Sequence, residues 1–168
     1  MLVLGIDPGT VRIGYGLVRA AGGQQLEAVD YGCIRLKKLR SAPEGLLLVF
    51  DAIGELIARY QPDVMAVEQL FFNKNVQSAM AVGQARGVII LAGAQAQLPV
   101  HEYTPLELKS AVVGYARADK HQVQTMTRQL LGLKELPQPA DAADALACAI
   151  TCLVTLETTR KMHRWEPS

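Results

Sequence analysis

The first third of the chain contains short, continuous apolar runs that are rich in β-branched residues. These runs cover residues 2–7, 11–20 and about 25–36, and the turn signals Pro8-Gly9 and Gly22-Gly23 separate them. Short apolar runs bounded by such turn signals are typical of buried strands. This part of the chain therefore predicts a meander of three strands.

The rest of the chain alternates between helical and strand patterns. The predicted elements are, in order, helix 43–60, strand 63–68, helix 75–97, strand 99–103, two helices opened by Pro105 and Asp119, and a last helix after Pro137-Gln138-Pro139. Each long helix is expected to gather its apolar residues on one side: Leu47, Phe50, Ile53, Leu56, Ile57 and Tyr60 on the first, and Val76, Met80, Gly83, Gly87, Leu91 and Ala94 on the second. The order βββαβαβααα is a mixed α/β plan.

Composition limits the class of protein. The chain has 168 residues, half of them apolar, which suits one compact domain over residues 1–157, followed by a polar tail over residues 158–168 that we expect to be flexible. Lys and Arg number 17 against 16 Asp and Glu. Because the charges balance, any contact with nucleic acid must come from local basic patches.

The cysteines and the apolar segments indicate a soluble cytoplasmic protein. Cys33, Cys148 and Cys152 are odd in number and have no Cys-x-x-Cys or histidine-rich context, so neither a disulfide framework nor a zinc site is expected. The first residues have no basic lead typical of a secretory signal. The longest apolar helical stretch, residues 142–156, contains Asp144 and is too short to span a membrane.

Four carboxylates stand where the predicted elements end or begin. Asp7 and Glu68 each end an apolar strand, and Asp141 and Asp144 lie three residues apart at the start of an alanine-rich helix. In open α/β sheets, active groups collect at the carboxyl ends of adjacent strands. Ionised carboxylates 4 Å apart repel by up to ~4 kcal/mol per pair at an effective dielectric of 20. Divalent cations relieve this repulsion, and Mg²⁺ prefers oxygen ligands, so the pattern predicts a metal-dependent phosphodiesterase that uses two ions.

Each acid also has a structural explanation. Asp-Pro-Gly is a common turn sequence, so Asp7 alone is evenly balanced between the two interpretations. Asp141 could simply complement the helix dipole. Glu68 and Asp144 are harder to explain in this way, because both adjoin strongly apolar segments. The four acids together favour the metal site.

The motifs around these acids closely resemble those of RuvC, the family of bacterial Holliday-junction resolvases in the retroviral-integrase and ribonuclease H superfamily. The matching segments are Gly5-Ile6-Asp7-Pro8-Gly9-Thr10, Gly14-Tyr15-Gly16, Val67-Glu68-Gln69-Leu70-Phe71 with Lys74-Asn75, Gly83-Gln84-Ala85-Arg86-Gly87, and residues 140–147. The resemblance implies a ribonuclease H-like fold with a mixed five-stranded sheet flanked by helices. It also implies a homodimer that makes paired incisions in a four-way DNA junction during recombination and repair, leaving 5′-phosphate and 3′-hydroxyl ends, with the RuvA–RuvB branch-migration complex as a partner.

The resemblance assigns roles to single residues. Asp7, Glu68, Asp141 and Asp144 match the four catalytic acids, which would hold two Mg²⁺ per subunit, with Mn²⁺ as a substitute. By analogy with related nucleases, Asp7 would bridge both ions, Asp144 would hold the ion that activates water, and Glu68 would hold the other. Asp141 is the least defined, since relatives can have histidine there.

The expected DNA contacts are basic and aromatic residues near these motifs. Lys109 and Lys120 match family positions that contact DNA, Arg117 lies close to them in sequence, Phe71 matches an aromatic that stacks near the junction centre, and Lys74 belongs to the same motif. Each has a simpler alternative, a solvated helix charge for the basic residues and core cover for Phe71. Gly83 and Gly87 make the helix 75–97 a candidate dimer contact, although the same residues could pack on the sheet.

Two other functions remain open from the sequence. Gly-Ile-Asp-x-Gly-Thr also opens the phosphate loop of actin-like ATPases and sugar kinases, but that architecture needs a second such domain, and the motif occurs once here. A non-catalytic DNA-binding protein of the same fold is the other alternative. The intact set of four acids argues against it.

Overall fold

The computed structural model describes residues 1–9, 11–22, 25–36, 42–69 and 76–163. The elements are β1 (Leu2–Asp7), β2 (Arg12–Gly22), β3 (Gln25–Arg35), α1 (Ala42–Tyr60), β4 (Val64–Glu68), α2 (Val76–Gln95), β5 (Val100–Tyr103), α3 (Pro105–Val113), α4 (Lys120–Leu130) and α5 (Ala140–His163). Their order is the order that the hydrophobic pattern predicts, and most boundaries agree to within two residues.

The strands form one mixed sheet in the order β3-β2-β1-β4-β5. The β1–β2 and β2–β3 pairs are antiparallel, whereas β4 pairs in parallel with both β1 and β5. In the β1–β4 pair, Ile6 lies opposite Val67, so the residues that follow them, Asp7 and Glu68, reach the same edge of the sheet. Parallel pairing thus brings together two acids that are far apart in the chain.

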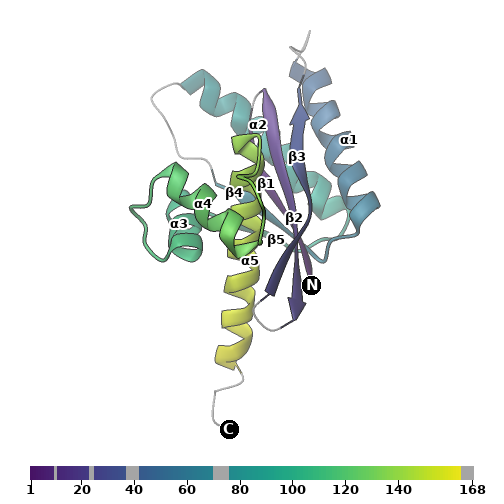
Figure 1. Ribbon diagram of the computed structural model, residues 1–168. Helices are drawn as coiled ribbons and strands as arrows, with labels where there is room; N and C mark the ends of the chain where they lie inside the picture. The colour runs from purple at the N-terminus through teal and green to yellow at the C-terminus, as the bar shows by residue number, and fades with distance from the viewer. Residues whose placement is uncertain (10, 23–24, 37–41, 70–75, 164–168) are drawn as a thin grey trace.

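Helices cover both faces of the sheet (Figure 1), and alternate residues of each strand serve the two faces. On one face α5 lies across the strands, with α3 and α4 beside it, and the buried strand residues there are Val3, Val18, Val64, Ala66 and Tyr103. On the other face α1 and α2 cover Leu4, Ile6, Ile13, Leu17, Met65 and Val67. The central strands are therefore buried on both sides, as their unbroken apolar runs predict.

Three glycines allow α5 to approach the sheet closely. A Cβ atom on Gly5 would lie 2.1 Å from the carbonyl oxygen of Ala145, and one on Gly14 would lie 2.0 Å from that of Asp141. A Cβ atom on Gly16 would lie 2.8 Å from the backbone nitrogen of Leu146. Because these strand positions lack side chains, the start of α5 rests directly on β1 and β2. This contact fixes the two acids of α5 next to the end of β1.

The short helices begin at side-chain caps. Thr104 accepts a hydrogen bond from the backbone N–H of Glu107 at 3.2 Å, and the Glu107 carboxylate accepts one from the Thr104 N–H at 2.7 Å. Asp119 and Gln122 form the same reciprocal pair at the start of α4, with both distances 2.8 Å. Such capping boxes satisfy backbone donors that a helix start otherwise leaves unpaired. They confirm the helix starts predicted at Pro105 and after Asp119.

Two sequence-based expectations about the helices are corrected. Leu47 was expected on the same side of α1 as Ile53, but Leu47 is exposed, whereas Val49 and Ile53 are buried. The reason is that, at 3.6 residues per turn, Leu47 points about 120° away from Ile53. The last helix is longer than residues 142–156, and it includes residues 158–163 of the predicted tail.

Among the described residues, α5 is the one helix long and apolar enough to span a membrane, yet most of its apolar segment is buried inside the domain. It is a core helix.

Candidate active site

Three of the four predicted acids line one cavity at the edge of the sheet. The cavity has a volume of about 280 Å³ and is lined by Asp7, Pro8, Glu68, Gln69, Pro105, Lys120 and Asp144. Asp7 and Glu68 are the last residues of β1 and β4, and Asp144 lies in the second turn of α5. The sheet register and the glycine contact with α5 together produce this convergence.

A second cavity of about 270 Å³ shares Glu68, Lys120 and Asp144 with the first. It extends toward α3 and α4, where Lys109 lies on its wall together with Leu108 and Val123. The acids therefore adjoin a groove that combines two lysines with apolar side chains. Such a groove can accept a negatively charged backbone beside the acids.

Burial and mutual repulsion strongly perturb the acids. Burial and, to a smaller extent, the charges of the other three acids together raise the pKa of Asp7 to about 8. Burial and the charge of Asp144 raise the pKa of Glu68 to about 7. At neutral pH this cluster therefore retains protons that ordinary carboxyl groups lose. The positive charge of Lys120 opposes these rises without cancelling them.

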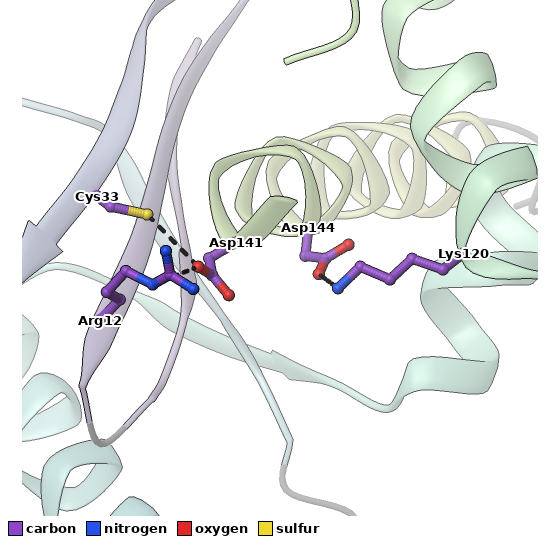
Figure 2. Close-up of polar contacts among 5 residues, drawn as sticks. All are labelled: Arg12, Cys33, Lys120, Asp141 and Asp144. Carbon is purple, nitrogen blue, oxygen red and sulfur yellow. Dashed lines mark hydrogen bonds and ion pairs between the residues drawn. The ribbon is translucent and has the colours of Figure 1, made fainter. Parts of the chain in front are cut away.

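The two acids of α5 are paired with cations on opposite sides (Figure 2). The Lys120 ammonium lies 2.6 Å from Asp144 Oδ2. Arg12 Nε lies 3.3 Å from Asp141 Oδ2, and the Cys33 thiol donates to the same oxygen at 3.9 Å. Burial raises the pKa of Asp144, and the Lys120 ammonium opposes this rise. Burial and the charge of Asp141 likewise raise the pKa of the Cys33 thiol.

The donor set at the cavity fits a divalent cation of the Mg²⁺ type. The available ligands are carboxylate oxygens, which hard cations prefer, and a doubly charged ion would relieve the repulsion that raises the pKa of Asp7. Within the described ranges, no three carboxylate, thiol or imidazole side chains already form a closed metal cage. The pairing of Asp141 and Asp144 with separate cations accounts for this open arrangement, because each carboxylate is turned toward its own partner.

The structure separates the other residues that the sequence singles out. Lys109 and Lys120 lie at the cavities, whereas Arg117 is exposed between α3 and α4 and lines neither of them. Phe71 and Lys74 lie outside the described residues. Asp141, predicted beside Asp144, lines neither cavity, because its carboxylate faces β2.

Sequence analysis missed Arg12 and Cys33 as neighbours of the site. A signal for both exists in the strand pattern. Arg12 lies two residues before Gly14 on β2, so both face the same side of the sheet, and Cys33 lies directly opposite Gly14 on β3. Once Gly14 is known to lie under α5, the other two residues must lie near Asp141.

Comparison with known proteins identifies the family. The family model for the crossover junction endodeoxyribonuclease RuvC matches residues 3–152. Proteins of that name from Moorella thermoacetica and Desulfitobacterium hafniense are 58% and 56% identical to this chain over 150 residues. The alignments cover 89% of this chain and 89% and 90% of the respective relatives.

Solved structures give the same result. RuvC from Thermus thermophilus superposes with a TM-score of 0.88 at 34% identity, over 95% of this chain and 97% of that one. The same protein in complex with a Holliday junction substrate gives a TM-score of 0.89, also at 34% identity, over 95% and 96% of the two chains. The yeast mitochondrial resolvase Ydc2, at 14% identity and a TM-score of 0.73, covers 95% of this chain and 82% of its own and shares the fold. The predicted ribonuclease H-like fold is confirmed, and the chain belongs to the RuvC family of crossover junction endodeoxyribonucleases.

Proposed function

We propose that this chain resolves four-way DNA junctions by metal-dependent hydrolysis of phosphodiester bonds. The observation that carries the proposal is the convergence of Asp7, Glu68 and Asp144 on a cavity that continues into a lysine-bearing groove, in a chain of the RuvC family. The complex of the Thermus thermophilus relative with a Holliday junction substrate supports the choice of substrate. The products would be nicked duplexes with 5′-phosphate and 3′-hydroxyl ends.

In this proposal Asp7, Glu68 and Asp144 hold divalent cations, two Mg²⁺ per subunit with Mn²⁺ as an alternative. When bound, such cations activate water and neutralise charge on the reacting phosphate. A bound cation would stabilise the ionised form of Asp7 most, because burial and the charges of all three other acids raise the pKa of Asp7. We therefore propose Asp7 as the principal ligand of the cation site. Asp141 is a fourth candidate ligand, although its carboxylate faces Arg12 on β2 in this structure.

The lysines of the site would exchange partners when DNA binds. Lys120 pairs with Asp144, and the lysine side chain is 59% exposed, so its ammonium can turn from Asp144 toward another anionic partner. Once a cation occupies the acids, the Lys120 ammonium is free to contact a phosphate. Lys109 lies in the adjoining groove, where it can contact a neighbouring phosphate of the same DNA strand. Leu108, Val123 and Ala147 supply the apolar part of the wall of that groove.

Cutting two strands symmetrically requires two active sites, so we propose a homodimer. The outer side of α2 supports this. Met80 and Leu91 are 64% and 57% exposed, and a Cβ on the exposed Gly87, which lies between them, would meet no atom within 4 Å. The opposite side of α2, with Ala85, Ile89 and Ala92, is the side that packs on the domain. The outer apolar stripe is therefore available to a second copy.

The proposal includes three further points that family membership suggests. Residues 1–157 act as one nuclease domain, with the polar end of α5 and the tail after it outside the catalytic unit. The protein works in the cytoplasm. The RuvA–RuvB branch-migration complex is a partner, which co-purification on a junction substrate would test.

The proposed function is tested with a synthetic four-way junction and a matched linear duplex, each with and without Mg²⁺. We expect symmetric nicks in the junction alone, only with Mg²⁺, and DNA ligase should seal them. Asp144→Asn should bind the junction without cutting it, because the fold is kept and a cation ligand is lost. Binding without incision by the parent would favour a non-catalytic protein, and ATP hydrolysis would favour the kinase-like alternative.

A further inference from the structure

We propose that Arg12 is a positioning residue that holds Asp141 outside the cation-binding cavity. Asp141 would then join the other acids only when a divalent cation replaces Arg12 as its partner. The inference rests on the proposed function, since it concerns the same cation site. In this inference, Arg12 lowers the affinity of the site for a divalent cation.

The sheet geometry directs Arg12 to Asp141. Arg12 and Gly14 lie on the same face of β2, and the missing side chain of Gly14 brings the Asp141 backbone to within 2.0 Å of where a Cβ would lie. The Asp141 side chain therefore emerges beside β2, where Arg12 Nε meets its Oδ2 at 3.3 Å. Cys33, opposite Gly14 on β3, donates to the same oxygen at 3.9 Å. Two strands thus supply donors to a single carboxylate oxygen.

These contacts draw Asp141 away from the acid with which it shares a helix turn. Asp144 is directed into the cavity toward Lys120, whereas Asp141 is directed to the opposite side (Figure 2). Asp144 accordingly lines both cavities and Asp141 neither. Yet Asp141 is near enough for its charge to raise the pKa of Asp7. A change of its side-chain direction, without movement of α5, would bring it toward the other acids.

Arg12 is suited to a reversible restraint. Its side chain is 53% exposed, and exposed ion pairs are weak, so a divalent cation can displace it. Removal of Arg12 should leave Asp141 free to contribute to cation binding. From the usual strength of such pairs we expect an increase in affinity of about threefold.

The test is calorimetric titration of Mn²⁺ into the full-length protein without DNA. We expect Arg12→Gln to bind Mn²⁺ about threefold more tightly than the parent, and Arg12→Lys, which keeps the charge, to stay close to the parent. In an Asp141→Asn background, Arg12→Gln should have no effect. Arg19→Gln is the matched control, because Arg19 is on the same strand, is 50% exposed and pairs with Glu27 at 3.8 Å. It should bind Mn²⁺ as the parent does.

The outcomes separate this inference from the function on which it rests. Unchanged or weaker Mn²⁺ binding by Arg12→Gln overturns it. An equal gain in the Asp141→Asn background also overturns it, because Arg12 would then act as a general positive charge. If the parent itself binds no Mn²⁺, the proposed cation site fails, and the role of Arg12 fails with it.

Discussion

The crowding of acids at the cavity predicts that Asp7→Asn stabilises the metal-free protein. Asp7 has an ordinary pKa of 3.8, which the folded state raises to about 8. Between these two values the folded state holds a proton that the unfolded chain has lost. The free energy of unfolding therefore falls as pH rises through this window. Asparagine does not titrate in this range, so the free energy of unfolding of the variant should not fall on account of residue 7.

The structure sets the size of the effect. One pKa unit corresponds to about 1.36 kcal/mol, so the change at Asp7 corresponds to at most about 5 kcal/mol at pH 8. Local rearrangement of the cluster reduces this value, and we expect Asp7→Asn to raise the free energy of unfolding at pH 8 by about 2 kcal/mol or more. At pH 4 the gain should nearly vanish. The variant keeps Glu68, whose pKa is raised to about 7. Its free energy of unfolding should therefore still fall with pH, but by less than that of the parent.

The assay is urea unfolding in EDTA at pH 5 and pH 8, followed by circular dichroism. Asp51→Asn is the control, because Asp51 is exposed on α1, and this variant should keep the pH dependence of the parent. Adding Mg²⁺ at pH 8 should stabilise the parent more than Asp7→Asn. The reasoning is refuted if the parent and Asp7→Asn lose the same stability between pH 5 and pH 8.

Three further predictions follow from the contacts around the site and the dimer surface. Gly14→Ala places a Cβ against the Asp141 backbone, so we expect thermal melting to show a loss of about 1–3 kcal/mol and junction incision to fall; unchanged melting would contradict the close contact. Lys109→Ala should weaken junction binding and reduce the slope of log affinity against log salt by about 1, and an unchanged slope would mean that this lysine does not meet phosphate. Met80→Lys should convert the dimer to monomer in sedimentation experiments, whereas the control Met162→Lys, on an exposed part of α5, should not; a dimer in both would place the interface elsewhere.

Much of the fold could be predicted because local patterns agree with the tertiary structure. The apolar runs of β1 and β4 are continuous because both faces of these strands are covered. The starts of α3 and α4 follow from Thr104 and Asp119, whose side chains cap these helices locally. Asp7 and Glu68 could be placed together because parallel strands end at the same edge. These features depend on short-range chemistry or on a single rule of chain direction.

Other features depend on contacts that a linear pattern does not contain. Helix spacing places Asp141 next to Asp144, but the partners Arg12 and Lys120, from β2 and α4, decide where each carboxylate points. Likewise, helical periodicity could not decide whether the side of α2 with Gly87 faces the sheet or solvent. The crossing of α2 over the sheet determines that this side faces outward.

The central claim is that acids from β1, β4 and α5 form one cation-binding site. Anomalous diffraction from crystals soaked in Mn²⁺ tests it most directly. We predict peaks within coordination distance of Asp7, Glu68 and Asp144 in the parent, and their loss in Asp7→Asn. Peaks elsewhere on the surface, or no peak at these carboxylates in a protein that still cuts junctions with Mn²⁺, would contradict the account.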